Sequence, residues 1–256
     1  MKQQVGNILN FWEKTGSSKP AGELVTHRDV NQVSLEIKTV LDLLDKRDIV
    51  LDVGCGNGFA SSVYAKKCRR LTGVDYSVNM VESALKAYAR KNLTFFQADV
   101  LSPNVIKGSY STVITTRCLI NLLNWKFQKK AIQNIHRMLG KNGKFIFIEG
   151  IRQGRDNLNK LRNELGLSSL PKVWYNRDFD YDKLMLFLKD LFYVRKEIRF
   201  GLYDVLTRAY YPASIYPKEP CYNSSYHRCA EKLYLESKRD LFDDCSRELC
   251  LELIKK

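Results

Sequence analysis

One stretch decides the fold: Val50-Leu51-Asp52-Val53-Gly54-Cys55-Gly56-Asn57-Gly58, a short apolar run that ends in three glycines spaced two residues apart. The run from Ile49 to Val53 predicts a buried strand. Glycine lets a backbone turn tightly and lie close to a ligand, so the glycines predict a turn that cradles a nucleotide before a helix begins near Phe59. Such a turn on its own is weak evidence, because dinucleotide-binding enzymes and ordinary loops contain similar strings.

Two further acids follow strand-like runs later in the chain. Asp75 ends the run from Leu71 to Val74, and Asp99 ends the run from Leu93 to Ala98. An acid at the carboxyl end of the second strand of such a unit can accept both hydroxyls of a ribose. Asp99 is placed to bind an exocyclic amine.

These motifs resemble those of the class I S-adenosylmethionine-dependent methyltransferases: an acid followed by Gly-x-Gly-x-Gly, an acid that ends the second strand and an acid that ends the third. Dehydrogenases usually have Gly-x-Gly-x-x-Gly, whereas the third glycine here comes one position earlier. The specific motifs lie between about residues 29 and 150. The resemblance implies S-adenosylmethionine as the cofactor. The residues expected to bind it are Phe11, Trp12, Asp52, Gly54, Cys55, Gly56, Asp75, Tyr76, Asp99, Val100 and Arg117.

Length and composition favour one domain over residues 1–256, because 256 residues with 45% hydrophobic content can bury a sizeable core. No apolar run approaches the ~18 residues of a membrane span, and the first residues lack the pattern of a signal peptide. The seven cysteines are scattered and include no Cys-x-x-Cys pair. We therefore expect a cytoplasmic protein, a monomer or a homodimer, with no membrane segment, metal site or disulfide framework.

The net charge of +14 comes from scattered basic pairs such as Lys66-Lys67 and Arg69-Arg70. Pairs of this kind usually belong to solvated helix faces. Alternatively, they attract an anionic acceptor, which is either a phosphorylated small molecule or RNA.

The alternation of strand and helix patterns predicts an α/β fold, a Rossmann-like sandwich of three layers with right-handed crossovers. By resemblance, its sheet has seven strands and is mainly parallel, with an antiparallel last strand between the fifth and the sixth. Helices are expected at 8–15, 29–44, 59–68, 78–91, 126–139, 157–165 and 180–192. Strands are expected at 49–53, 71–75, 93–98, 110–116, 144–149, 193–200 and 248–254.

Methyl transfer from a sulfonium is a direct displacement, in which the protein aligns the acceptor and excludes water. A base is needed only if the acceptor must lose a proton. His27 and His227 are candidate bases at neutral pH. Arg117, after the fourth strand, can hold a phosphate or carboxylate, or it can pair with Glu149 or another acid at a strand end. These three residues, His27, His227 and Arg117, are the catalytic candidates.

The acceptor should bind outside the carboxyl ends of the strands. The candidates there are Asn121, Glu149, Arg152, Trp174, Tyr175, Asn176, Tyr203 and Tyr210. Enzymes that methylate base amino groups often have Asp or Asn, two prolines and an aromatic residue after the fourth strand. This chain has Thr115-Thr116-Arg117-Cys118 instead, which argues against base amino methylation. Cys118 does not follow a proline, so we expect an inert cysteine.

Two segments complete the prediction. By resemblance, residues 1–28 are expected to cover the cofactor, with Phe11 and Trp12 over the sulfonium or, alternatively, packed into the core. Residues 201–228 join the last two strands and contain six tyrosines and three prolines, so we expect an ordered lid over the acceptor or, alternatively, a dimer interface. The sequence predicts methyl transfer to a small polar acceptor, neutral or anionic, such as a sugar, a nucleotide sugar or a phosphorylated metabolite. The alternatives are an RNA methyltransferase and a non-catalytic protein that binds S-adenosylmethionine.

Overall fold

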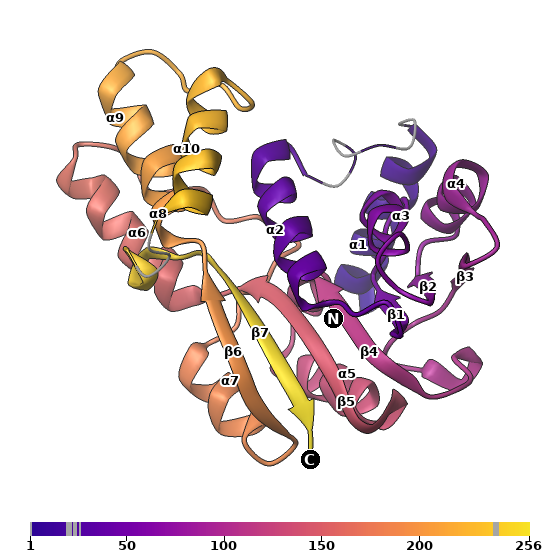
Figure 1. Ribbon diagram of the computed structural model, residues 1–256. Coiled ribbons are helices and arrows are strands. Elements are labelled where there is room, and N and C mark those ends of the chain that lie inside the picture. The colour runs from indigo at the N-terminus through magenta and orange to yellow at the C-terminus, as the bar shows by residue number, and fades with distance from the viewer. Residues whose placement is uncertain (1, 19–21, 23–24, 26, 238–240) are drawn as a thin grey trace.

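The computed structural model describes residues 2–18, 22, 25, 27–237 and 241–256. Seven strands form one twisted sheet in the order β3-β2-β1-β4-β5-β7-β6, with helices on both faces (Figure 1). Strand β7 is antiparallel to both β5 and β6, and the other pairs are parallel. The predicted sheet is therefore confirmed. The strands are β1 (Ile49–Val53), β2 (Arg70–Asp75), β3 (Leu93–Gln97), β4 (Tyr110–Thr116), β5 (Leu139–Gly150), β6 (Phe192–Arg199) and β7 (Glu248–Lys255).

The expected helices are present, with differences at their ends. Helix α1 is a full helix of 17 residues rather than a short piece at 8–15. Helix α6 begins five residues before the expected start at residue 157, and α3 ends four residues before the expected end at residue 68. The helices are α1 (Lys2–Ser18), α2 (Val30–Leu43), α3 (Phe59–Tyr64), α4 (Val78–Tyr88), α5 (Trp125–Met138), α6 (Arg152–Glu164), α7 (Tyr181–Leu188), α8 (Gly201–Asp204), α9 (Tyr211–Ile215) and α10 (Ser225–Glu236). The short turns are η1 (Pro103–Val105), η2 (Leu119–Asn121), the π-helical η3 (Val205–Tyr210) and η4 (Asp243–Cys245).

Successive side chains of a strand point to opposite faces of the sheet, and this divides the core into two parts. Val50 of β1 packs in the same cluster as residues of α2, α3 and α4, whereas Leu51 packs with residues of α5 and α7 on the other face. Phe145 and Ile146 of β5 alternate in the same way. The carboxyl ends of the parallel strands are thus held at one edge, between the two helical layers.

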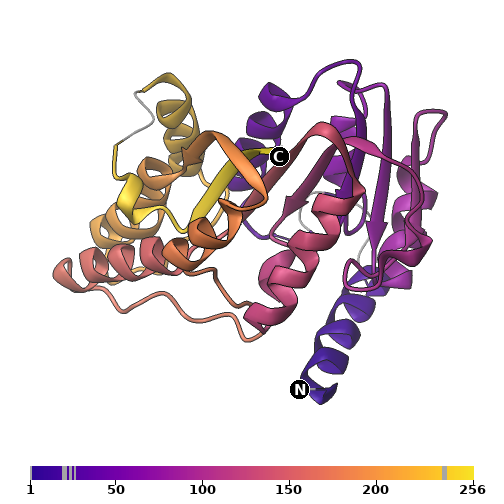
Figure 2. The same ribbon diagram turned by 90° about the horizontal axis from the view of Figure 1, so that it is seen from below.

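Two additions flank this core. Helix α1 packs against α4, and Figure 2 shows its N-terminal end extending away from the sheet. The chain between β6 and β7 forms α8, η3, α9 and α10, which lie beside α6 and α2 (Figure 1). Residues 201–228 are therefore mostly helical. Of the segment 1–28, residues 1, 19–21, 23–24 and 26 lie outside the described residues.

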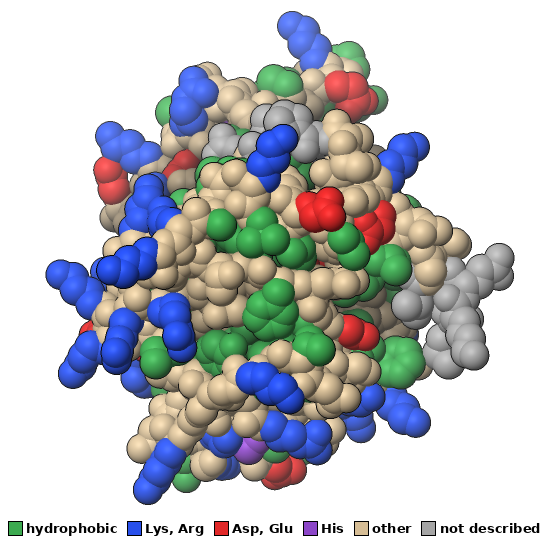
Figure 3. Space-filling view, turned by 90° about the vertical axis from the view of Figure 1, so that its right-hand side faces the viewer, with side chains coloured by type: hydrophobic (Ala, Val, Ile, Leu, Met, Phe, Trp, Pro, Cys, Tyr) green, Lys and Arg blue, Asp and Glu red, His purple; other side chains and the backbone are tan. Residues whose placement is uncertain are grey.

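The basic residues are spread over the face shown in Figure 3, where Lys and Arg side chains surround patches of hydrophobic ones instead of forming a continuous tract. This face favours the interpretation of the charge as solvated pairs. In the described part of the chain, no helix is both long and apolar enough to cross a membrane.

Candidate functional site

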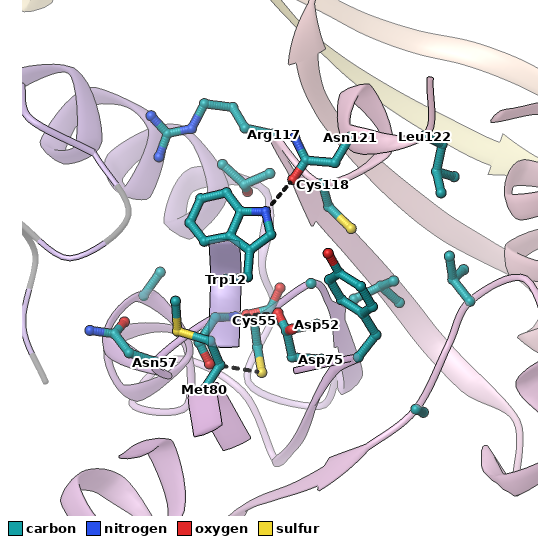
Figure 4. Close-up of a pocket in the computed structure, with 18 of the residues that line it drawn as sticks. Trp12, Asp52, Cys55, Asn57, Asp75, Met80, Arg117, Cys118, Asn121 and Leu122 are labelled. Carbon is teal, nitrogen blue, oxygen red and sulfur yellow. Dashed lines mark hydrogen bonds between the residues drawn. The ribbon is translucent and has the colours of Figure 1, made fainter. Parts of the chain in front are cut away.

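A cavity of about 220 Å³ opens at the carboxyl ends of β1, β2 and β4. Its walls come from the turns after these strands, from α1 and α2, and from the start of α5. In Figure 4, Trp12 lies in the middle of the lining residues, with Arg117 and Asn121 on one side and Cys55 and Asp75 on the other. All the predicted cofactor-binding residues except Phe11 line this cavity.

The glycine turn forms one wall because its backbone requires glycine. Gly54, Gly56 and Gly58 have φ values of 74°, 53° and 78°, in the left-handed region. A Cβ atom on Gly54 would lie 2.3 Å from Sγ of Cys118, so the turn also packs tightly against the loop after β4. The tight turn predicted from the glycines is present, with Cys118 as its packing partner, and its role in binding a nucleotide stays a prediction.

Asp75 and Asp52 place two buried carboxyl groups beside the turn. Oδ2 of Asp75 accepts a hydrogen bond from the backbone N–H of Gly56 at 2.9 Å, and Oδ1 accepts one from Ser77 N–H at 2.9 Å. Asp52 accepts a hydrogen bond of 2.5 Å from the hydroxyl of Ser61. Burial raises the pKa of each acid to about 6. Both are therefore ionised acceptors at neutral pH, as a site for ribose hydroxyls and a positively charged ligand requires.

Arg117 follows β4 with a left-handed φ of 50°. Its Nη2 lies 3.3 Å from Oε2 of Glu36, and its buried Nη1 has no hydrogen-bond partner among the described residues. Arg117 therefore contacts Glu36 on α2 and not Glu149, and its charge also lowers the pKa of Glu248, the strand-end acid at the start of β7. The spare nitrogen can donate to an oxygen of a ligand.

Glu149 was predicted to bind the acceptor, but the structure places its side chain elsewhere. Its carboxylate is fully buried and accepts hydrogen bonds from the backbone N–H groups of Cys118, Leu119 and Ile120 at 3.2, 2.9 and 3.1 Å. Burial raises its pKa to about 7. Glu149 therefore fixes the loop after β4 and does not line the cavity.

Aromatic residues from two distant segments meet above the cavity. Phe11 stacks on Tyr175 with ring centroids 4.7 Å apart, and Trp174 packs edge-on against Phe11 at 5.8 Å. The indole N–H of Trp12 donates to Oδ1 of Asn121 at 3.1 Å. Phe11 thus contributes to this cover rather than to the cavity wall, and α1 is joined to the loop at 174–176.

Asn121 connects the same cover to the loop after α6. Its Nδ2 donates to Oδ1 of Asn176 at 2.8 Å. Trp174, Tyr175 and Asn176 therefore lie next to the cavity, and Asn121 is the acceptor candidate that lines it. The structure brings these four predicted residues together.

The two histidines are poorly placed as bases. His27 does not line the cavity, and burial, together with the nearby Arg117, lowers its pKa to about 3. Burial also lowers the pKa of His227, whose ring nitrogens face Ser224 Oγ at 3.0 Å and an Arg208 nitrogen at 3.4 Å. Neither histidine lines the cavity, so the structure gives no support to a histidine base.

Three acceptor candidates lie away from the cavity. Arg152 is half exposed on α6, where it pairs with Asp156 and Asp180 at 3.1 and 2.6 Å. Tyr203 is buried, whereas Tyr210 is 58% exposed. No residue of 201–228, all of which the structure describes, lines the cavity. The segment packs beside α2 instead of over the cavity.

Sequence reasoning missed Glu36, which lines the cavity from α2. A signal was present, because Glu36 interrupts the apolar face formed by Val33, Ile37 and Val40. An acid on the buried face of a helix indicates a polar partner inside the fold. Other lining residues that the sequence did not indicate are Asn57, Tyr64, Met80, Leu101 and Phe127.

Comparisons with known proteins match the part of the chain that contains the glycine turn and the strands around it. Residues 50–143 match the family model "Methyltransferase domain". The chain is 31% identical to the ribosomal RNA small subunit methyltransferase C of Buchnera aphidicola, over 39% of this chain and 31% of that protein. It is also 31% identical to the demethylmenaquinone methyltransferase of Lactococcus lactis, over 39% of this chain and 41% of that protein. The chain thus spans less than half the length of these curated relatives.

Solved structures resemble the whole fold. An S-adenosylmethionine-dependent methyltransferase from Anabaena variabilis superposes with a TM-score of 0.61, with 17% identity, over 98% of this chain and 94% of that one. The N-methyltransferase NodS from Bradyrhizobium japonicum, in complex with S-adenosylhomocysteine, gives a TM-score of 0.57 with 13% identity, over 96% and 97% of the two chains. At identities of 13% and 17%, the similarity to these two structures shows a shared fold and nothing more.

Proposed function

The chain contains a class I S-adenosylmethionine-dependent methyltransferase domain, and from this premise we propose that it transfers a methyl group to a small polar acceptor that carries an anionic group. The fit of the cofactor is supported by the glycine turn and by the ionised carboxylates of Asp52 and Asp75 beside it. When bound, S-adenosylmethionine supplies an activated methyl group on a positively charged sulfur.

The observation that carries the acceptor class is the guanidinium group of Arg117. It lines the cavity, is held by Glu36 on one side and keeps a buried nitrogen without a partner among the described residues. An unpaired buried donor is costly unless a ligand or water satisfies it. A carboxylate or phosphate oxygen of the acceptor suits this donor.

The size of the acceptor is limited by the cover above the cavity. Trp12 donates a hydrogen bond to Asn121, the rings of Phe11 and Tyr175 pack against Trp12, and Trp174 packs against those two rings. Such an enclosure favours a small molecule over a folded nucleic acid.

We also propose that the protein works in a reducing compartment such as the cytoplasm. All seven cysteines are free, which supports this proposal.

The first experiment measures binding of S-adenosylmethionine and S-adenosylhomocysteine by calorimetry, and then release of S-adenosylhomocysteine with panels of sugar phosphates, small carboxylic acids, neutral sugars and tRNA. We expect turnover with anionic small molecules. Turnover only with tRNA, together with a steep dependence of binding on salt, would support the RNA alternative that the name of the Buchnera relative raises. Binding without turnover on any panel would support a non-catalytic protein.

A matched pair of variants tests the role of Arg117. Arg117→Lys keeps the charge but loses the planar fork, so kcat/KM for the anionic acceptor should fall about ten- to hundredfold. Arg152→Lys, on the outer side of α6, should leave it unchanged. Equal effects in the two variants contradict the proposed contact.

A further inference from the structure

Glu36 is an acid of the cavity whose own proton chemistry the proposed function does not use. It comes from α2, lines the cavity next to Arg117 and is only 2% exposed. Removing a carboxylate from water is costly unless it is paired or protonated. Its neighbours therefore decide what the group can do.

Groups from three elements determine the state of the carboxyl group of Glu36. Nη2 of Arg117, after β4, lies 3.3 Å from its Oε2. The charge of Glu248, at the start of β7, acts on this carboxyl group and raises its pKa. The amide of Gln32 on α2 donates to Oε2 of Glu248 at 3.1 Å, whereas Oε1 of Glu36 is buried and has no hydrogen-bond partner among the described residues. Repulsion between two buried carboxylates that interact in this way favours a proton on one of them.

The charges around the pair decide where this proton lies. Burial alone would raise the pKa of Glu248, but the charges of Arg117 and Arg247 lower it. Glu248 is therefore the ionised member of the pair, and its partner Glu36 holds the proton.

For Glu36, the effects of burial and of the neighbouring charges add up to a raised pKa. Burial raises its pKa well above the usual value, Arg117 opposes this, and the charge of Glu248 adds to it. Tyr64 of α3 and Cys250 of β7 also face Glu36, but burial raises the pKa of both, so they are neutral. A further positive charge in the cavity would stabilise the ionised form of Glu36.

We propose that Glu36 takes up the proton that the acceptor loses on methylation, and that the charge on the cofactor sulfur controls when Glu36 can do so. This inference rests on the proposed function. S-adenosylmethionine has a positively charged sulfur, whereas the sulfur of S-adenosylhomocysteine is neutral. Glu36 therefore loses its proton to solvent when the charged cofactor binds, which prepares it as a base.

The transfer step balances with Glu36 as the proton acceptor. The acceptor oxygen or nitrogen forms a bond to the methyl carbon, the bond from that carbon to sulfur breaks, and sulfur keeps the electron pair. The proton of the acceptor passes to the carboxylate of Glu36. Because the positive charge on sulfur disappears in the same step, Glu36 becomes a stronger base as the proton arrives.

Proton counting tests this inference without a known acceptor. Calorimetric titrations at pH 8 in two buffers of different ionisation enthalpy give the number of protons released on binding. Asp52 and Asp75, with pKa values of about 6, are already ionised at that pH. We expect close to one proton with S-adenosylmethionine and none with S-adenosylhomocysteine. The ratio of the two affinities should rise with pH, by up to about tenfold per pH unit.

Three variants assign the proton. Glu36→Gln keeps the shape of the side chain and should release no proton with either ligand. Glu252→Gln is the control, because Glu252 of β7 is also 2% exposed but does not line the cavity, and it should behave as the wild type. Glu248→Gln removes the neighbouring charge, so Glu36 ionises at lower pH and the release at pH 8 should decrease. The Glu248→Gln variant tests the inference even if Glu36→Gln does not fold.

Equal proton release with both ligands overturns the inference, and so does release that persists in Glu36→Gln. If neither ligand binds the wild-type protein, the proposed function itself fails, and the inference fails with it. Binding of both ligands with equal release would leave the proposed function standing and remove only the role of Glu36.

Discussion

The cofactor side and the acceptor side of the cavity are built in different ways. On the cofactor side, contacts join neighbouring turns: the bond from Gly56 N–H to Asp75 spans 19 residues. On the acceptor side, contacts join distant segments: the bond from Trp12 to Asn121 spans 109 residues, and that from Gln32 to Glu248 spans 216. The matched family region, 50–143, contains the first kind of contact and leaves α1, α2 and β7 outside.

From this difference we infer that cofactor binding and acceptor choice are encoded in different parts of the chain. Binding of the cofactor depends on short motifs at strand ends, which many acceptor specificities can share. We propose that the choice of acceptor depends on the helices that cover this edge of the sheet. Variants on the two sides should therefore fail in different ways, and the following predictions test that separation.

The largest effect is expected on the cofactor side, from Gly54→Ala. The new Cβ atom would lie 2.3 Å from Sγ of Cys118, and φ of 74° is unfavourable for alanine. We expect S-adenosylhomocysteine affinity to fall more than about a hundredfold, measured by calorimetry.

The control for backbone strain is Gly166→Ala. Gly166 has φ of 73°, but no atom of the described residues outside its chain neighbours lies within 4 Å of the position that a Cβ would take. This variant should lose about 1 kcal/mol of stability and keep its affinity. If Gly54→Ala binds as well as Gly166→Ala does, the turn is not the cofactor cradle.

The sheet and the cofactor side could be predicted because their signals are local. The apolar run to Val53, the glycines after it and the acids Asp75 and Asp99 each occupy a few consecutive positions. The alternating pattern at 248–254 likewise indicated β7, although its place in the sheet came from the resemblance. Helix ends were less accurate: α7 ends at Leu188 because β6 already begins at Phe192.

The acceptor side could not be predicted from local patterns. Nothing in the residues around Arg117 indicates that its partner is Glu36, and the position of Glu149 at a strand end gave no sign that backbone N–H groups occupy its carboxylate. Tyr203 and His227 were plausible from composition, but burial and long-range contacts decide their roles. Sequence periodicity reports which face is buried and does not report the partner.

A smaller effect is expected for Asp75→Ala, which tests whether the cofactor side depends on charge as well as on shape. Loss of charge-assisted hydrogen bonds should weaken cofactor binding about ten- to hundredfold. Because burial raises the pKa of Asp75 to about 6, wild-type affinity should also fall as the pH decreases below 6, when the carboxylate is protonated. Calorimetry at pH 5 and pH 7.5 measures both effects, and unchanged affinity in the variant would refute the assignment.

The smallest effects should come from residues 201–228, which support the acceptor side from outside. The hydroxyl of Tyr203 is buried and donates to both carboxylate oxygens of Asp29, at 2.9 and 3.0 Å. Asp29 in turn caps α2, since Oδ1 accepts from Asn31 N–H and Gln32 N–H at 3.1 Å each. Arg208 of the same segment pairs with Asp29. The segment therefore helps to fix the helix that carries Glu36.

Two tyrosines provide a matched test, because each loses only a hydroxyl on replacement by phenylalanine. Tyr203→Phe should reduce the free energy of unfolding by about 1–2 kcal/mol, since a buried hydrogen bond to a charged group is lost. Tyr210→Phe, at a 58% exposed position, should change it by less than about 0.5 kcal/mol. Urea denaturation measures both, and neither variant should alter cofactor affinity. If instead Tyr210→Phe impairs methyl transfer while stability is unchanged, the segment closes over the acceptor as a lid, and its position beside α2 is only one of its two states.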